Sequence, residues 1–304
     1  MKTTLVLISS LLAVTGTGIG QERDYQLELP DTPGEAPRFT PPPDSAIPDN
    51  QFGEMVRRGR DLFINTQQLR GKYVGNDLNC VNCHVDAGRR ADSAPLWAAY
   101  TMYPAYRGKN DRVNTMEERI QGCFRYSMNG KPPPSGSEEL TAILTYHYWL
   151  AKGAPTGVAL AGRGYPKLDS PDKTPAIRRG QQVYQAQCTI CHADDGQGRK
   201  AEGEHIFPPL WGEDSFNWGA GMHRINTAAN FIHANMPLGK PYSLSEQEAW
   251  DVAAYINSHE RPQDPRNDGD LKTTDQTFHN HQCYYGDKIN DAVLGSQAYP
   301  NPFE

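Results

Sequence analysis

The 304-residue sequence predicts an all-α fold of two similar units in tandem. Two observations lead to this prediction. A Cys-x-x-Cys-His motif occurs twice, at residues 80–84 and 188–192. The segments around the two motifs also resemble each other, and they show the apolar spacing and the caps that are typical of helices. Repeated segments of this kind indicate two copies of one structural unit.

Each motif has the spacing that attaches a haem c group covalently. Positions three and four apart on a helix share a face, so two thiols can bond to one porphyrin edge while the histidine reaches the iron. A zinc site or a pair of disulfides would use the cysteines but leave both histidines without a role. We therefore expect two covalently attached haem c groups, one at Cys80, Cys83 and His84 and one at Cys188, Cys191 and His192.

The elements of each unit follow in the same order. A first helix is predicted before each motif, because residues 56–63 and 177–184 share an Arg-Arg-Gly run between apolar positions. A Pro-Leu-Trp sequence follows each motif. A closing helix ends each unit, at about Ser137–Ala151 and Ser243–Ser258, with a serine cap and early glutamates. Their aromatic side chains are predicted to lie in the core: Tyr146, Tyr148, Trp149, Trp250 and Tyr255.

This order resembles the class I cytochrome c domain, in which the closing helix crosses the first. Each unit is small for a domain that buries a core unaided, and a haem would supply the missing apolar centre. We expect a signal peptide at 1–20, a Pro-rich segment at 21–52, cytochrome c domains at 53–152 and 176–262, a linker at 153–175 between them, and a C-terminal arm at 263–304 packed over a domain.

The N-terminal residues have the features of an exported protein. An early lysine, an apolar run from Leu5 to Val14 and small residues up to Gly20 are typical of a secretory signal peptide. The apolar run is too short to span a bilayer, and no later segment is apolar enough to do so. Haem c in an exported chain indicates the bacterial periplasm. We expect neither a membrane span nor a nucleic-acid partner.

The sixth iron ligand decides what each haem can do. Met236 is the candidate for the second haem, and Met222 is its rival. A methionine ligand raises the reduction potential, as suits an electron carrier. In the first unit Met128 stands near the equivalent place, but Cys123 lies five residues before it. Cys123 could also form a disulfide with Cys283 of the arm, and the sequence leaves this open.

The segment from Glu118 to Gly130 around Cys123 resembles the thiosulfate dehydrogenases, a tetrathionate-forming family of dihaem cytochromes c. The resemblance extends over about residues 53–262. It implies that the first iron is held by His84 and Cys123 and is where substrate reacts.

The same resemblance implies that His192 and Met236 hold the second iron and that Arg119 and Ser127 contact the substrate. Some family members carry a lysine just before the methionine, where this chain has Asn235. We therefore do not expect a lysine to replace the methionine ligand here.

The charge distribution also favours an anionic substrate at the first haem. The chain has a net charge of −6, yet residues 85–131 hold eight Lys/Arg and five Asp/Glu, whereas residues 193–240 hold four and six. A local positive excess attracts a small dianion. Candidate substrate contacts are Arg89, Arg90, Arg107, Lys109, Arg112, Arg119 and Lys131.

We expect an enzyme, a thiosulfate dehydrogenase that oxidises two thiosulfates to tetrathionate at haem 1. The same site can in principle run backwards and reduce tetrathionate. A thiolate ligand lowers the potential of haem 1, so electrons should pass to haem 2. From there they would reach a soluble acceptor such as a small cytochrome c or a high-potential iron-sulfur protein. Two alternatives remain: a non-catalytic electron-transfer cytochrome with Met128 on haem 1, and a dihaem peroxidase. No role is predicted for His147, His205, His223 or His233.

Overall fold

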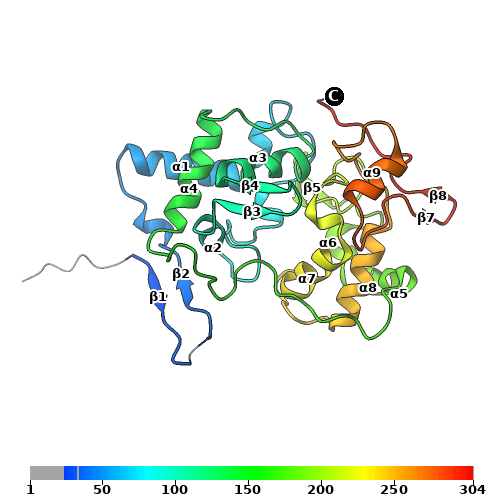
Figure 1. The fold of residues 1–304 in the computed structure, drawn as a ribbon, viewed down its shortest axis with the longest axis horizontal. Helices are drawn as coiled ribbons and strands as arrows, with labels where there is room; N and C mark the ends of the chain where they lie inside the picture. The colour runs from blue at the N-terminus through cyan, green and yellow to red at the C-terminus, as the bar shows by residue number, and fades with distance from the viewer. Residues whose placement is uncertain (1–23, 33, 304) are drawn as a thin grey trace, which may run out of the picture.

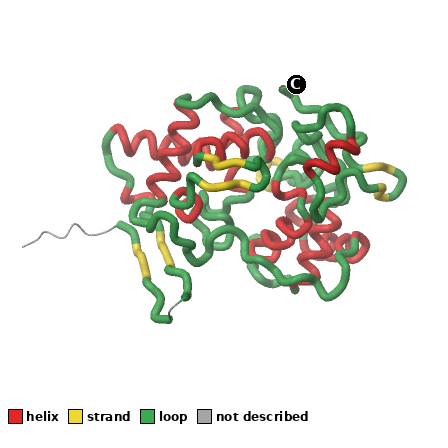
Figure 2. Tube along the Cα trace, in the orientation of Figure 1, coloured by secondary structure: helices red, strands yellow, loops and turns green. Residues whose placement is uncertain are grey.

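A computed structural model of the chain describes residues 24–32 and 34–303. The predicted signal peptide at residues 1–20 lies outside these residues. Within them the chain is mostly helix and loop, as Figure 2 shows. Figure 1 shows the first unit on the left and the second on the right. The predicted fold class, two helical units in tandem, is confirmed.

The helices follow the predicted order. Those of the first unit are α1 (Gln51–Ile64), α2 (Leu96–Tyr100), α3 (Met116–Tyr126) and α4 (Glu138–Leu150). Those of the second unit are α5 (Ile177–Gln187), α6 (Thr189–His192), α7 (Ile225–Asn235) and α8 (Glu246–Asn257). The C-terminal arm adds α9 (Leu271–Phe278). No helix of the described chain is long and apolar enough to cross a membrane.

The closing helix of each unit crosses the first helix, α4 across α1 and α8 across α5. The repeated Arg-Arg-Gly run places a glycine at each crossing. A Cβ on Gly59 would lie 2.0 Å from the Ala142 carbonyl oxygen, and one on Gly180 would lie 1.9 Å from the Asp251 carbonyl oxygen. The absence of a side chain at these two glycines lets the helix backbones approach this closely.

Serine caps begin both closing helices, as the sequence predicts. Ser137 accepts a hydrogen bond from the Leu140 amide at the start of α4. The cap of α8 is Ser245, with a capping box to Glu248, rather than the predicted Ser243. The prediction was wrong by two residues because Ser243 and Ser245 both precede acidic residues, and the reciprocal hydrogen bonds to Glu248 select the later serine.

The two haem-attachment motifs form only short turns. Residues Cys80–Asn82 form a single 3₁₀ turn, and Thr189–His192 form the short α6. The predicted haem-binding helix is therefore shorter than expected in both units. The cysteines and the histidine of each motif still lie within one turn, because the His84 and His192 amides donate to the Cys80 and Cys188 carbonyls.

The structure also contains short antiparallel strand pairs, which the sequence analysis did not predict. The pairs are β1 (Gln26–Glu28) with β2 (Arg38–Thr40), β3 (Ala105–Arg107) with β4 (Arg112–Asn114), β5 (Arg199–Ala201) with β6 (Glu204–Phe207), and β7 (Lys288–Ile289) with β8 (Ala292–Val293). Each pair is a hairpin at the edge of a helical unit, so the class of the fold does not change.

The aromatic residues of the closing helices mostly lie in the core. Tyr146 and Trp149 are fully buried, and Trp250 is nearly so. Tyr255 packs against the core of the second unit. The prediction was wrong for Tyr148, which is 51% exposed. Its ring packs edge-on against Phe52 and Tyr100 at the surface.

The two units share a polar and apolar interface. Arg70 of the first unit bridges Asp77 and Asp214, at 2.5 and 3.1 Å, and Lys200 of the second unit reaches Asp77 at 3.0 Å. Phe216 belongs to the same apolar cluster as the buried residues of α3 and α4. The loop of the second unit that carries Asp214 and Phe216 therefore forms part of the wall of the first unit.

The arm at residues 263–304 folds over the second unit rather than running across it as an extended strand. Figure 1 shows α9, β7 and β8 together beside α8. The arm has an apolar cluster of its own, in which Tyr285 and Leu294 pack on Trp218. The arm packs on the second unit through this cluster, and it contains a helix and a hairpin that its polar sequence did not reveal.

Candidate active site

Helix α3 brings the three predicted catalytic side chains together. Arg119, Cys123 and Ser127 are four residues apart, so they lie along one face of the helix. A capping box between Thr115 and Glu118 fixes the first turn of α3. This cap and the burial of the opposite face orient the three side chains towards one cavity of the first unit.

The second unit holds the C-terminal end of α3 in place. The Asn76 side-chain amide donates to the Ser127 carbonyl at 2.8 Å and to the Ser215 carbonyl at 3.0 Å. Asn217 of the second unit donates to the Arg125 carbonyl at 2.9 Å and to the Asn129 side chain at 3.1 Å. The position of this end of α3 therefore depends on contacts between the two units.

Arg119 and Cys123 form the most specific contact of the site. The Arg119 Nη1 atom donates to the Cys123 sulfur at 3.0 Å. The neighbouring Cys123 sulfur raises the pKa of Arg119, more than burial lowers it. The contact therefore holds a permanent positive charge directly against the sulfur atom.

The same cavity contains the first haem-attachment motif. Cys80, Cys83 and His84 line it together with Cys123 and Ser127. Burial, followed by the neighbouring Cys123 sulfur, raises the pKa of the Cys83 thiol to about 12. The three sulfurs therefore face a common space that is otherwise largely apolar, as a porphyrin requires.

His84 has the orientation of an iron ligand. Its Nδ1 atom lies 2.7 Å from the Ala94 carbonyl oxygen, and a carbonyl can only accept, so Nδ1 carries the proton. This leaves the Nε2 lone pair for a metal. Burial lowers the pKa of His84 to about 4, so the ring is neutral at neutral pH. The residues present therefore fit a covalently bound haem c.

The second motif repeats this arrangement. The His192 Nδ1 atom lies 3.0 Å from the Pro208 carbonyl oxygen, which leaves its Nε2 free in the same way. In both units the accepting carbonyl belongs to the residue just before the Pro-Leu-Trp sequence. Met236 follows the last residue of α7 and packs with Cys188 on the core of the second unit, and Met222 packs on the same core.

Two further side chains in the first cavity are relevant to iron ligation. Met128, the alternative ligand, lines the cavity and is 3% exposed. His147 lines it too, but its Nδ1 donates to the Ile143 carbonyl of its own helix at 2.8 Å. Cys123 forms no disulfide with Cys283, which lies beside His279 of the arm.

The predicted substrate-binding cations separate into two groups. Arg107 and Arg119 line the cavity. The other five do not line the cavity. Three of them have partners elsewhere: Arg89 binds Asp44, Arg112 binds Glu118, and Lys109 donates to the Gly219 carbonyl. The remaining two are Arg90 and Lys131. The sequence analysis missed one cation of the lining, Arg163. It lies in the predicted linker, where no motif marked it.

Comparisons with known proteins agree with this geometry. The family model described as SoxA/TsdA, cytochrome c domain matches residues 66–156, and that described as cytochrome C oxidase, cbb3-type, subunit III matches residues 175–256. The thiosulfate dehydrogenase of Thiomonas intermedia (strain K12) is 57% identical over 270 residues, which are 88% of this chain and 86% of that protein. This chain belongs to the thiosulfate dehydrogenase family.

Other members of the thiosulfate dehydrogenase family match over similar lengths. The thiosulfate dehydrogenase of Stutzerimonas stutzeri (strain A1501) is 50% identical over 97% of this chain and 99% of that protein. The solved structure of thiosulfate dehydrogenase (TsdBA) from Marichromatium purpuratum has a TM-score of 0.83 at 52% identity. That match covers 86% of this chain but only 58% of the other. The two motifs of this family member are therefore covalent haem c sites of two cytochrome c domains.

Proposed function

We propose that this protein oxidises two thiosulfate ions to one tetrathionate and passes two electrons to an external acceptor. Membership of the thiosulfate dehydrogenase family supports this reaction. The observation that carries the proposal is the 3.0 Å contact between Arg119 and the Cys123 sulfur inside the cavity that also contains His84. The contact supports the proposal because an arginine suited to bind an anion, a cysteine sulfur and the motif histidine share one space.

Substrate binding would use the positive side chains of the cavity. Arg107, Arg119 and Arg163 line it, and the guanidinium fork matches sulfonate oxygens much as it matches phosphate. The Ser127 hydroxyl, one turn beyond Cys123 on the same face of α3, can donate a further hydrogen bond. These groups would hold the sulfonate end of thiosulfate and leave its outer sulfur pointing at Cys123.

The proposed reaction proceeds through the Cys123 sulfur in two balanced steps. The outer sulfur of the first thiosulfate bonds to the Cys123 thiolate, which gives a Cys–S–S–SO₃⁻ adduct and releases two electrons. The outer sulfur of a second thiosulfate then attacks the adduct, so that tetrathionate leaves and the thiolate is restored. Arg119 stabilises the thiolate at the start and at the end of this cycle.

The haem c groups, when bound, supply the one-electron acceptors through which the two electrons leave. We propose His84 and Cys123 as the ligands of the first iron and His192 and Met236 as those of the second. The acceptor would be a small soluble cytochrome c or a high-potential iron-sulfur protein. The predicted signal peptide supports a periplasmic location.

The test is steady-state oxidation of thiosulfate by the purified dihaem protein with ferricyanide as acceptor and tetrathionate measured as product. We expect turnover in the parent and a loss of most of it in Cys123→Ala. Both proteins should bind two haem groups and unfold at similar temperatures. Full turnover in Cys123→Ala would contradict the role of this sulfur.

Met128 supports a second candidate function, a dihaem electron carrier, because it is buried in the same cavity as Cys123. Met128→Leu is close to isosteric and should cost less than about 1.5 kcal/mol of stability. If Cys123 is the ligand, the visible spectrum of haem 1 should not change in this variant. A parent that does not turn over, together with a changed haem 1 spectrum in Met128→Leu, would establish the electron carrier instead.

A further inference from the structure

A second cluster of metal-binding side chains lies outside the haem cavities. It consists of His223, from the 3₁₀ turn Gly221–His223 before α7, and His279, His281 and Cys283 from the arm. One ligand atom from each residue lies within 4.8 Å of the other three. His223 and His279 are 2% and 3% exposed. A group of three histidines and one cysteine that lie this close together, with two of the histidines buried, has the donor atoms of a metal site.

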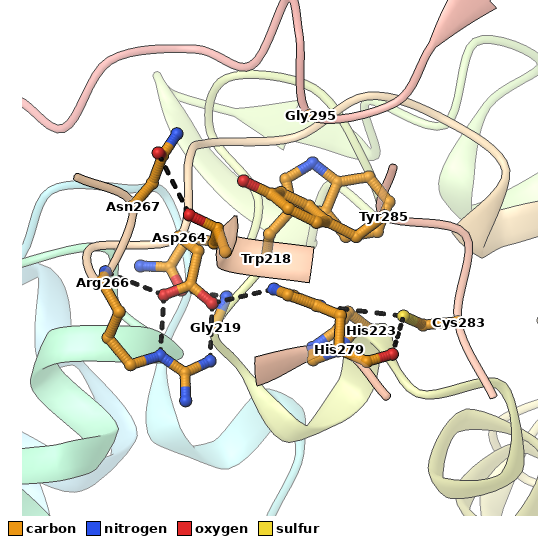
Figure 3. A network of polar contacts seen from close by, with 12 residues as sticks. Trp218, Gly219, His223, Asp264, Arg266, Asn267, His279, Cys283, Tyr285 and Gly295 are labelled. Atoms are coloured by element: carbon orange, nitrogen blue, oxygen red, sulfur yellow. Dashed lines mark hydrogen bonds and ion pairs between the residues drawn. The ribbon is translucent and has the colours of Figure 1, made fainter. Parts of the chain in front are cut away.

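His279 is oriented as a metal ligand by a carboxylate. Its Nε2 atom lies 3.0 Å from the Asp264 carboxylate, as Figure 3 shows. A carboxylate accepts this proton, so the Nδ1 atom faces Cys283 with a free lone pair, 3.7 Å from the sulfur. Arg266 holds Asp264 by two contacts, and the Tyr285 ring stacks on His279 at 4.0 Å. A carboxylate behind a histidine is the usual outer shell of a metal site.

His223 is oriented in the same way by a backbone carbonyl. Its Nδ1 atom donates to the Ala220 carbonyl, so its Nε2 atom presents a lone pair. That Nε2 atom lies 2.7 Å from the Nε2 atom of His281. Two imidazole nitrogens therefore face each other beside the Cys283 sulfur and the His279 Nδ1 atom.

We propose that His223, His279, His281 and Cys283 bind one zinc ion in a closed, four-coordinate site. Zinc bonds are about 2.0–2.1 Å to histidine nitrogen and about 2.3 Å to cysteine sulfur in a tetrahedron. These lengths place a nitrogen and a sulfur about 3.6 Å apart and two nitrogens about 3.4 Å apart. The 3.7 Å distance between His279 and Cys283 already fits, and the facing nitrogens of His223 and His281 must move apart by about 0.7 Å.

Two negative groups would offset the charge of a bound dication, the Cys283 thiolate on the ion and the Asp264 carboxylate behind His279. Together with Arg266, which binds Asp264, these groups and the zinc ion carry one net positive charge. Arg224 and Lys109 lie near the cluster and would repel an ion that lacked this compensation. Binding displaces the Cys283 proton to solvent. Three nitrogen donors and one thiolate favour zinc over calcium or magnesium, which prefer oxygen.

The site would tie the arm to the second unit. His223 precedes the three ligands of the arm by at least 56 positions, so the ion would close a long loop of the chain. The 3₁₀ turn of His223 is also held from α8, because the Asn257 side chain donates to the Met222 carbonyl at 3.1 Å. This inference does not depend on the proposed thiosulfate chemistry.

The first test uses the unaltered, untagged dihaem protein. Elemental analysis should find about one zinc per chain beside two irons. X-ray absorption at the zinc edge should show three nitrogens at about 2.0–2.1 Å and one sulfur at about 2.3 Å. Iodoacetamide should alkylate Cys283 only after a chelator removes the ion, as peptide mass spectrometry would show. Copper in place of zinc, or equal alkylation with and without chelator, would overturn the assignment.

The second test compares variants in zinc titrations of the chelator-treated protein. Cys283→Ala and His281→Ala should lose stoichiometric binding, whereas His233→Ala, a histidine on α7 outside the cluster, should retain it. Asp264→Asn keeps all four ligands and should weaken binding about 10- to 100-fold. A hydrogen-bonded cluster that binds no metal would give a parent no tighter than Cys283→Ala, and this result would refute the site.

Discussion

Gly180 makes the crossing of α5 and α8 possible, and Gly180→Ala tests this directly. The added Cβ would lie 1.9 Å from the Asp251 carbonyl oxygen and 2.8 Å from the Tyr255 Cβ. Atoms of these kinds need at least 3.0 Å, so the helices must separate by about 1 Å. Asp251 cannot move freely, because its buried carboxylate binds Arg179 at 2.7 Å and the Ala176 amide at 2.7 Å.

The magnitude follows from two opposing terms. Overpacking a well-packed contact costs about 1–3 kcal/mol, and the backbone obstacle places Gly180→Ala at the upper end of this range. Alanine recovers up to about 1 kcal/mol through its higher helix propensity. We expect a net loss of about 1–2 kcal/mol in the free energy of unfolding. Separation of the helices should also shift the haem 2 potential, since Cys188 directly follows α5.

Gly122 is the matched control because it lies inside α3 with nothing within 4 Å of its added Cβ. Gly122→Ala should therefore show the propensity term alone and raise stability by about 0.5–1 kcal/mol. Guanidinium unfolding followed by far-ultraviolet circular dichroism measures both variants. If Gly180→Ala proved as stable as Gly122→Ala, the close approach of α5 and α8 would not be the reason for a glycine at this crossing.

Two further predictions concern the site and its surroundings. Arg119→Gln should raise the KM for thiosulfate about 10- to 100-fold, because it removes a charged hydrogen bond worth about 1.5–3 kcal/mol. Arg125→Gln, on the exposed side of α3, is the control and should leave the KM unchanged. An equal rise of KM in both variants would mean that the overall charge, and not Arg119 itself, controls binding. Burial lowers the pKa of His259 below its usual 6.5 in the folded state, so the unfolded chain gains a proton first as pH falls and stability declines below about pH 6.5. His259→Phe keeps the ring stacked on Trp211 but removes the titrating group. The loss of unfolding free energy with falling pH should therefore become shallower by up to about 1.4 kcal/mol per pH unit. Denaturant titrations at several pH values measure this slope, and an unchanged slope would contradict the prediction.

The repeat made most of the fold predictable. The two motifs, the Arg-Arg-Gly runs and the serine caps are local patterns, and each places an element within a few residues. The strand pairs and the folded arm were not predictable in this way. The strands are two to four residues long, too short for a visible alternation, and the arm owes its order to contacts of Tyr285 and Leu294 with Trp218 of another segment.

The candidate site was predictable in part for the same reason. Arg119, Cys123 and Ser127 are spaced four residues apart on one helix, so the sequence alone predicts that they share a face. Arg163 comes from the segment between the units, and nothing local connects it to α3. The proposed zinc site was not predicted, although His279, His281 and Cys283 alternate along the chain in a short His/Cys tract, which is a known metal-binding pattern. The fourth ligand and Asp264 are distant in sequence, and only the fold brings them together.

The differences between the two units show where function was added to a common scaffold. Both units keep the glycine crossing and a motif histidine whose Nδ1 donates to the carbonyl before Pro-Leu-Trp. These shared features fix the orientation of the motif histidine at each haem c site. The first unit alone adds Cys123 and Arg119 on the helix that faces the motif. The second unit instead contributes the loop that holds the end of that helix. Because that loop and the proposed zinc ligand His223 lie in one continuous segment, residues 214–223, the proposed zinc ion would also restrain the loop that holds the end of α3.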